Sequence, residues 1–310
     1  MIKFASPIIL TLQSTLQDTI SLAIPQMQRS CHTKVDGTVD LPAGIRKQTS
    51  CEDALRRLII HRVPGLKFGF TGNQVAITFG PNTSDTTLIA YRIDGQDWQF
   101  TNISTGATHL LVNSNTTAVN LTYPITPSTF EMRVTNWAYG VQIAAVHVTQ
   151  GEKLIKIADF PRTIEVIGDS LSAGMYATYE GLASFAYGLG AGLGNTEYSV
   201  TAYPGICLFD KLCWGNPHGM LYQWFRTSDT SGRAEQAFGD NPEWWDFSKK
   251  PAADIVVINL GTNDNNSANN VTADGYVAQY KMLVEGVHKV YPKAQIILMA
   301  SCSFYLRKLL

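Results

Sequence analysis

Hydrophobic and polar positions change their spacing near residue 160, so the chain divides into two parts with different predicted folds. Before that point, short segments rich in β-branched and aromatic residues are separated by turn sequences such as Asp94-Gly95 and Tyr139-Gly140. The predicted strands are 67–71, 74–79, 87–93, 97–102, 109–112, 130–137 and 141–148. Because no helical periodicity intervenes, the pattern indicates a β-sandwich or a barrel, and we expect a β-sandwich domain over residues 31–150.

After residue 160, mostly apolar strands alternate with helical patterns. The predicted strands are 163–167, 198–202, 254–260 and 295–299, and the predicted helices are 182–193, 219–225 and 273–290. Strands of this kind belong to a parallel sheet that helices cover on both faces. We therefore expect a multidomain protein whose second domain, residues 161–310, is a three-layer α/β domain. In the long helix, Tyr276 and Tyr280 are expected to face the core.

Composition and short motifs indicate which binding partners are unfavourable and whether the protein is secreted. The 310 residues carry a formal net charge of −1, which does not favour nucleic acid or an anionic membrane as partner. No apolar stretch is long enough for a membrane span, and no Cys/His cluster has zinc spacing, so we expect neither a membrane span nor a metal or other cofactor. Residues 1–30 are expected to be a signal or disordered leader. Six Asn-x-Ser/Thr sequons favour a secreted glycoprotein: Asn82, Asn102, Asn115, Asn120, Asn265 and Asn270.

The five cysteines allow two disulfides. Cys207 and Cys213 are close enough in one predicted loop to be bridged, and Cys31 with Cys51 forms a second candidate pair. Free buried thiols are the alternative for all of them.

Three strand ends carry the candidate chemistry. The first predicted strand runs into Gly168-Asp169-Ser170, where a serine hydroxyl beyond the carboxyl end of a parallel strand can act as a nucleophile. The alternative is that Ser170 caps the following helix. The third strand ends in Gly261-Thr262-Asn263, and the Asn263 amide can donate to a developing oxyanion or else form a turn. Between them, Gly205 offers a backbone N–H for the same task or is a turn glycine.

Together these segments resemble the SGNH hydrolases, also called GDSL esterases: Gly-Asp-Ser-Leu at 168–171, a glycine at 205, and Gly-Thr-Asn-Asp at 261–264. The resemblance covers residues 161–301. It implies a flavodoxin-like fold in which Ser170 is both the nucleophile and an oxyanion donor, together with Gly205 and Asn263. The preceding all-β part resembles the jelly-roll domain of carbohydrate-esterase family 2 and of related secreted fungal proteins. That likeness implies deacetylation of plant cell-wall polysaccharide such as xylan or glucomannan.

The chain departs from the SGNH pattern in lacking the segment that supplies the catalytic base. These enzymes take it from an Asp-x-x-His segment after a fifth strand, but no such motif follows residue 264 and the chain stops at Leu310. We therefore expect a C-terminally truncated domain without its last strand and helix, and with reduced or no activity, because loss of a triad member costs a factor of about 10⁴–10⁶. His218 is the candidate substitute base, although nothing in the sequence fixes its tautomer, and a surface-loop histidine is the alternative. The long helix returns to the opposite edge of the sheet, so His288 near its end is expected far from Ser170. The other histidines lie in or before the β domain: His32, His61, His109 and His147.

The segment between the second and third strands is rich in aromatic residues. Trp214, Trp224, Trp244 and Trp245 either offer a stacking surface for a sugar ring or form the core of a long loop. The acidic residues of this segment, Asp210 among them, are expected to be solvated loop charges.

The sequence thus predicts a monomeric serine esterase that acts on acetylated polysaccharide or another ester. Two alternatives stay open: a non-catalytic carbohydrate-binding protein and a lipid acyl hydrolase, which would need a deep apolar acyl pocket.

Overall fold

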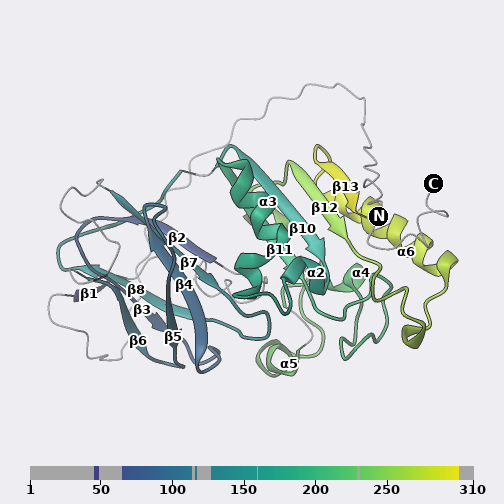
Figure 1. Ribbon diagram of the computed structural model, residues 1–310, viewed down its shortest axis with the longest axis horizontal. Helices are drawn as coiled ribbons and strands as arrows, with labels where there is room; N and C mark the ends of the chain where they lie inside the picture. Colours follow the sequence, from purple (N-terminus) through teal and green to yellow (C-terminus); the bar gives the residue numbers. More distant parts are fainter. Residues whose placement is uncertain are drawn as a thin grey trace, which may run out of the picture.

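The computed structural model describes residues 45–48, 65–113, 116, 127–158, 160–228 and 231–299 (Figure 1). The strands among the described residues up to Ile155 are all antiparallel, and this part is called the β region below. Residues 162–299, called the α/β region, contain a parallel sheet with helices. The predicted leader, the Cys31–Cys51 pair and residues 300–310 lie outside the described residues.

The β region contains two antiparallel sheets. The first has the strand order β1-β8-β3-β6 and comprises β1 (Ile45–Gln48), β3 (Val75–Phe79), β6 (Thr108–Val112) and β8 (Ile143–Thr149). The second has the order β5-β4-β7-β2-β9 and comprises β2 (Gly65–Phe70), β4 (Thr87–Ile93), β5 (Gln99–Ile103), β7 (Ser128–Val134) and β9 (Leu154–Ile155).

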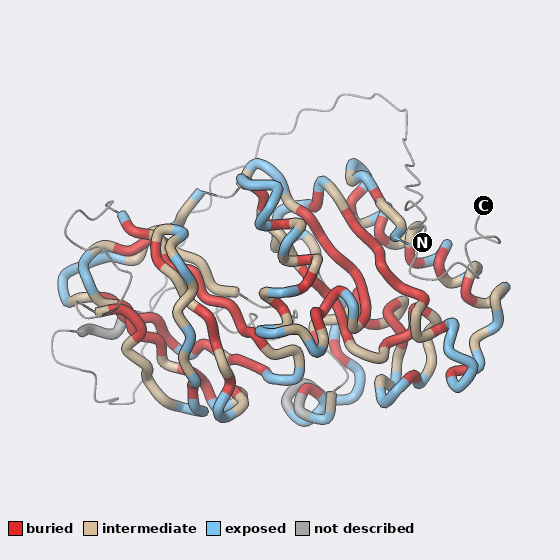
Figure 2. The backbone as a smooth tube through the Cα atoms, viewed as in Figure 1, coloured by how far each residue is buried: buried red, intermediate tan, exposed pale blue. Residues whose placement is uncertain are grey.

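Both sheets contribute to one hydrophobic core. In β3 the alternate residues Val75, Ile77 and Phe79 are fully buried, and in β7 Phe130 and Met132 join the same cluster. Successive side chains of a strand point to opposite faces, so one face of each sheet supplies this core. Figure 2 shows the buried stretches of these strands in red.

The α/β region is built on a parallel sheet with the order β11-β10-β12-β13 among the described strands. Its strands are β10 (Arg162–Gly168), β11 (Thr196–Ala202), β12 (Ile255–Asn259) and β13 (Gln295–Met299). Gly168 pairs with Ala202 on one side and with Asn259 on the other. The carboxyl ends of β11, β10 and β12 therefore lie level, and the loops that follow these strands share one edge of the sheet.

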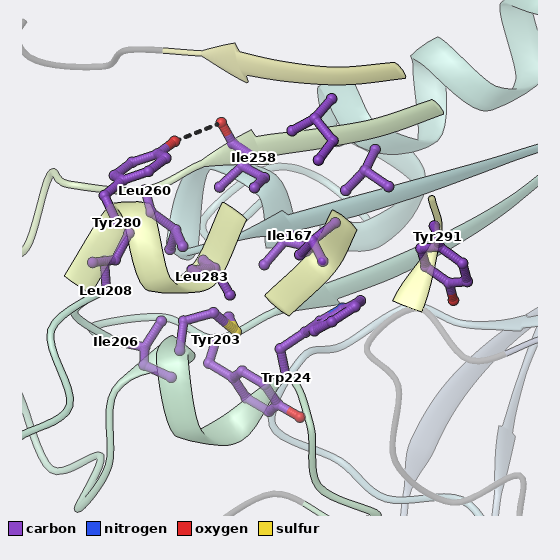
Figure 3. Packing of buried hydrophobic residues seen from close by; sticks show 14 of the residues in the cluster. Ile167, Tyr203, Ile206, Leu208, Trp224, Ile258, Leu260, Tyr280, Leu283 and Tyr291 are labelled. Carbon is purple, nitrogen blue, oxygen red and sulfur yellow. Dashed lines mark hydrogen bonds between the residues drawn. The ribbon is translucent and has the colours of Figure 1, made fainter. Parts of the chain in front are cut away.

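Helices cover both faces of this sheet, as the sequence predicted. On one face, Val166 of β10 shares a cluster with Ala186 of α3 (Phe185–Leu193). On the other, Ile167 shares a cluster with Leu283 of α6 (Ala273–Val290). Figure 3 shows this second cluster, in which Tyr280 donates a hydrogen bond to the Ile258 carbonyl oxygen at 3.5 Å. Tyr276 and Tyr280 are buried, which confirms their predicted core positions.

Shorter elements occupy the loops. They are α2 (Ser170–Ala173), α4 (Met220–Gln223), α5 (Gly232–Phe238) and the 3₁₀ helices η1 (Glu180–Ala183), η2 (Phe247–Lys249) and η3 (Ser267–Asn269). Of these the sequence predicted only the α4 segment, because elements of one or two turns carry little periodicity. Within the described residues, no helix combines the length and apolarity that a membrane crossing requires.

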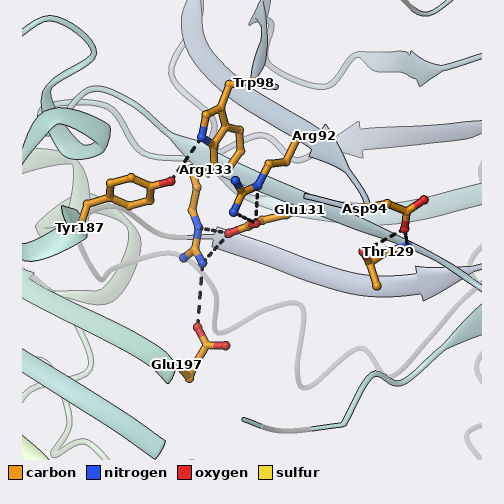
Figure 4. A network of polar contacts seen from close by, with 8 residues as sticks. All are labelled: Arg92, Asp94, Trp98, Thr129, Glu131, Arg133, Tyr187 and Glu197. Carbon is orange, nitrogen blue, oxygen red and sulfur yellow. Dashed lines mark hydrogen bonds and ion pairs between the residues drawn. The ribbon is translucent and has the colours of Figure 1, made fainter. Parts of the chain in front are cut away.

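A charged network joins the two regions (Figure 4). Glu131 of β7 accepts hydrogen bonds from Arg92 at 2.8 Å and from Arg133 at 2.9 Å. Arg133 is buried, and its guanidinium lies 4.5 Å from the centre of the Tyr198 ring on β11. Beside this network, the Trp98 indole donates to the Tyr187 hydroxyl at 3.3 Å. The β region is thus packed directly against β11 and α3 of the α/β region.

Candidate active site

Ser170 begins helix α2 immediately after strand β10. Asp169 occupies the N-cap position, and its side chain accepts a hydrogen bond from the Leu171 backbone N–H. The alternative that Ser170 is the helix cap is therefore wrong, because Asp169 fills that role. Ser170 is partly exposed, and among the described residues nothing hydrogen-bonds its hydroxyl. The hydroxyl and the backbone N–H of the first helical residue are both available to a ligand.

Asp169 is completely buried. Burial raises the pKa of its carboxyl to about 6, although hydrogen bonds from the Leu171 N–H and the Thr262 side chain act in the opposite direction. The Thr262 contact connects the end of β10 with the loop after β12. Asp169 therefore acts as a clamp between the first and third of the strand ends that the sequence singled out.

The segment after Ser170 is held by the β region. Tyr179 stacks on Phe100 of β5 with ring centroids 4.2 Å apart. Glu180 accepts a hydrogen bond from the Trp137 N–H at 2.9 Å, and the Gly181 N–H donates to the Thr135 carbonyl at 3.1 Å. The two regions thus share the construction of the candidate site.

Gly205 lies in the loop after β11. Its φ of +80° is left-handed, and a Cβ built there would lie 2.7 Å from the Cβ of Trp214, so both conformation and space require glycine. This loop contains the Cys207–Cys213 disulfide, which confirms the predicted pair. The Tyr203 N–H donates to the Gly168 carbonyl at 3.2 Å, which holds the start of the loop against the end of β10.

Asn263 and Asp264 lie in the loop after β12 and bind the loop after β11. The Asn263 side-chain amide donates to the Ile206 carbonyl at 2.8 Å. The Asp264 carboxylate accepts from the N–H groups of Leu208 and Phe209 at 2.8 and 2.9 Å. Burial nevertheless raises the pKa of Asp264, because desolvation outweighs these two donors. Each amide nitrogen carries two hydrogens, so Asn263 retains a second donor for a ligand.

The structure therefore brings Ser170, Gly205 and Asn263 to one edge of the parallel sheet, where hydrogen bonds join their loops. Sequence reasoning missed the two buried carboxylates that connect them. Both belong to the motifs, as the residue before Ser170 and the residue after Asn263, but their burial could not be inferred from a polar residue type.

His218 has a more ordered environment than the sequence indicated. Its Nδ1 lies 2.9 Å from an Asp210 oxygen, and its ring stacks on Tyr222 with centroids 3.9 Å apart. The same Asp210 oxygen accepts from the Gly219 N–H at 3.0 Å. The expectation that nothing orients His218 was wrong, because these partners lie close only after the loop folds back on itself. Asp210 is partly solvated, as predicted, with a side chain that is 34% exposed, and it also holds His218 and Gly219.

The tryptophans of this segment divide between the two predicted roles. Trp224 is 1% exposed, and its indole N–H donates to the buried Glu165 at 3.2 Å, so it belongs to the core. Trp214 and Trp244 are 58% and 66% exposed. The loop-core interpretation holds for Trp224, and a stacking surface stays open for the two exposed residues.

The fold is similar to that of solved carbohydrate esterases. A family two carbohydrate esterase from Clostridium thermocellum in complex with cellohexaose is 22% identical, with a TM-score of 0.64 over 81% of this chain and 78% of that one. A Corynascus thermopiles family 2 enzyme with a carbohydrate-binding domain is 22% identical, with a TM-score of 0.61 over 83% and 78%. An acetyl xylan esterase from Butyrivibrio proteoclasticus is 18% identical, with a TM-score of 0.58 over 83% and 78%. At these identities the likeness shows the fold.

The sequence comparisons concern the second half of the chain. No curated protein matches the sequence. Residues 166–308 match the model of the GDSL-like Lipase/Acylhydrolase family, and this segment contains Ser170, Gly205 and Asn263. This segment therefore matches a GDSL-like lipase/acylhydrolase domain, and an N-terminal region precedes it.

Proposed function

We propose that this protein is a serine esterase that removes acetyl groups from a polysaccharide, with xylan of the plant cell wall as the leading substrate. Ser170 is the nucleophile: its Oγ bonds to the acetyl carbonyl carbon, and its proton passes to a base. The sugar hydroxyl then leaves, and water releases acetate from the acyl-enzyme. The structural likeness to esterases that bind or act on polysaccharides supports the substrate class.

The oxyanion of the tetrahedral intermediate is bound by the N–H groups of Ser170 and Gly205 and by the Asn263 amide. The observation that carries this proposal is the Asn263–Ile206 hydrogen bond of 2.8 Å. It fixes the amide of the third strand end against the residue that follows Gly205. Donors that are oriented before the reaction stabilise developing charge without reorganising.

His218 is the candidate base within the described residues. Of the four described histidines, His109 and His147 lie on β6 and β8, and His288 lies in the last turn of α6, whereas His218 lies in the loop after β11. The Asp210 contact engages Nδ1, so Nε2 is the nitrogen that would take up the Ser170 proton.

The test is hydrolysis of 4-nitrophenyl acetate and release of acetate from acetylated xylan, with Ser170→Ala as control. We expect turnover on both substrates and a loss of at least about 10³-fold in the control. A rate that is the same in both proteins would contradict the proposal. Binding of xylan without any Ser170-dependent turnover would support the carbohydrate-binding alternative instead.

A His218→Ala variant in the same assay identifies the base. If His218 serves Ser170, kcat falls by about 10³-fold or more. Slow turnover that depends on Ser170 but does not change in His218→Ala would mean that His218 is not the base. The reduced activity expected from the sequence would then explain the rate.

For the N-terminal part we infer a jelly-roll sandwich, on the basis of two antiparallel sheets with one shared core. We also propose that the protein is secreted. The Cys207–Cys213 disulfide and the exposed sequon residues Asn102, Asn265 and Asn270 support this. When the protein is expressed in a secreting eukaryotic host, we expect to recover it from the culture medium. Its mass should fall on N-glycosidase treatment, and an unchanged mass would contradict glycosylation.

A further inference from the structure

Trp214 occupies a backbone conformation that tryptophan rarely adopts. Cys213 and Asn216 exchange two backbone hydrogen bonds of 2.9 Å, so Trp214 and Gly215 form a two-residue hairpin turn. Their φ angles are +47° and +84°. Turns with positive φ at both central positions favour asparagine or glycine, and a bulky side chain there is an outlier. Strain of this kind in a folded protein points to a functional constraint.

The turn that carries Trp214 is fastened beside Gly205. The Cys207–Cys213 disulfide closes its base, and the Asn216 side chain donates to the carbonyl of Pro204 at 3.0 Å and to that of Cys213 at 3.2 Å. The contact between the Trp214 Cβ and the Gly205 position shows how close the two residues lie. The turn therefore fixes the point where the Trp214 side chain begins at the side of the proposed oxyanion donor.

The Trp214 ring is also open to a ligand. It is 58% exposed, and within the described part of the chain no aromatic ring or cation stacks on it. Trp244 is 66% exposed, but the Arg226 guanidinium lies 4.3 Å from the centre of its ring and also contacts Tyr222. One face of Trp244 is thus already occupied, whereas Trp214 presents an unused apolar surface.

We propose that Trp214 is a sugar-binding residue that stacks on the pyranose ring bearing the scissile acetyl ester. An indole face matches the area of a sugar ring far better than that of an acetyl methyl group, so it binds the alcohol portion of the ester. Stacking there directs the carbonyl oxygen toward the Gly205 N–H. The inference rests on the proposed esterase function and adds the residue that selects the substrate.

The test compares two substrates in Trp214→Asn, because asparagine suits the positive φ and should fold at least as well as tryptophan. We expect the ratio of kcat/KM on acetylated xylo-oligosaccharide to kcat/KM on 4-nitrophenyl acetate to fall about tenfold, the size of one aromatic stacking contact. Trp214→Phe should retain most of that ratio. Trp244→Ala is the matched control, for which the ratio should not change.

An unchanged ratio in Trp214→Asn, or an equal fall in Trp244→Ala, would overturn the proposal. A second measurement separates its failure from that of the esterase function: titration of Ser170→Ala with xylohexaose, followed by intrinsic fluorescence. Binding that weakens about tenfold when Trp214→Asn is added supports Trp214 even if no turnover is found. Equal binding in both proteins, or none in either, overturns it whatever the esterase assay shows.

Discussion

The β region and the α/β region bury carboxylates in opposite ways. Burial alone would raise the pKa of Glu131, but the adjacent Arg133 and Arg92 guanidinium groups outweigh it and lower the pKa of that carboxyl. Asp169 instead meets neutral donors, and burial raises its pKa to about 6. Its Oδ2 is buried without a hydrogen-bond partner among the described residues. Positive groups neutralise the charge of Glu131, so that charge is stable in the folded protein. No positive group in the described part of the chain neutralises the charge of Asp169, so ionising that carboxyl costs folding free energy.

The two kinds of buried carboxylate lie in different places: one stabilises the β region, and the other lies beside the candidate active site. In the β region, the buried Glu131 carboxylate binds Arg92 and Arg133, and the Arg133 guanidinium in turn lies over the Tyr198 ring of the α/β region. Carboxyls with raised pKa values at the strand ends hold the loops that carry Ser170, Gly205 and Asn263. Upward pKa shifts that gather where parallel strands end are typical of functional sites, although structural networks can produce them too.

The largest expected effect comes from removing the Glu131 carboxylate from its ion pair with Arg133. Glu131→Gln should lower the free energy of unfolding by about 3–5 kcal/mol, because it removes the nearer and more buried of the two anions beside Arg133. Urea unfolding at neutral pH measures this. Glu197→Gln is the control: its carboxylate lies 3.9 Å from Arg133 and is 42% exposed, so the loss should stay below about 1 kcal/mol. Equal losses in the two variants would contradict the comparison.

The next largest effect concerns Asn263, which lies in a loop that Asp169 and Asp264 hold in place. Asn263→Ala should reduce kcat on 4-nitrophenyl acetate by about 10²–10³-fold, equivalent to about 2.7–4 kcal/mol, because one oxyanion donor is lost. Asn266, which is exposed and caps η3, gives the matched control, and Asn266→Ala should leave kcat within about twofold. If kcat of Asn263→Ala is unchanged while KM rises, Asn263 binds substrate rather than the oxyanion.

The unsatisfied charge should appear in the pH dependence of stability. Because the folded pKa of Asp169 is raised, its favourable contribution to stability is present below the ordinary carboxyl pKa of 3.8 and is lost as the pH rises through about 6. Asp169→Asn should therefore gain stability relative to the unaltered protein between pH 4 and 7, by up to about 3 kcal/mol. Glu131 has the opposite sign, since its contribution is lost as the pH falls through its lowered pKa. Unfolding titrations at several pH values would refute this if the Asp169→Asn difference were constant.

The smallest effect concerns the stacking contact between the regions. Phe100→Ala should lower the free energy of unfolding by about 1 kcal/mol, because its stack on Tyr179 is lost. Tyr139 is similarly exposed, at 41% against 37%, and Tyr139→Ala should change stability by less than about 0.5 kcal/mol. A loss in Phe100→Ala no larger than in this control would mean that the stack contributes nothing.

Elements with long periodic patterns could be predicted from the sequence. Strand β4, helix α6 and strand β13 have the predicted bounds, because burial on one face leaves a repeated signature in the chain. The two-residue strand β9 and the helix α5 were missed, since so few residues give no period. Strand β9 also lies beyond residue 150, where the predicted β domain ended.

For the site, the sequence determined the three strand-end motifs and therefore which residues to examine. Only the tertiary structure decided what holds them. Asp169 and Asp264 form their contacts with residues from other loops, and the Asp210–His218 pair depends on the fold of one loop. Trp214 and Trp224 are the same residue type in one segment, yet one is exposed beside Gly205 and the other is buried. Burial and the partner of a polar group are properties of distant residues brought together, and no local pattern records them.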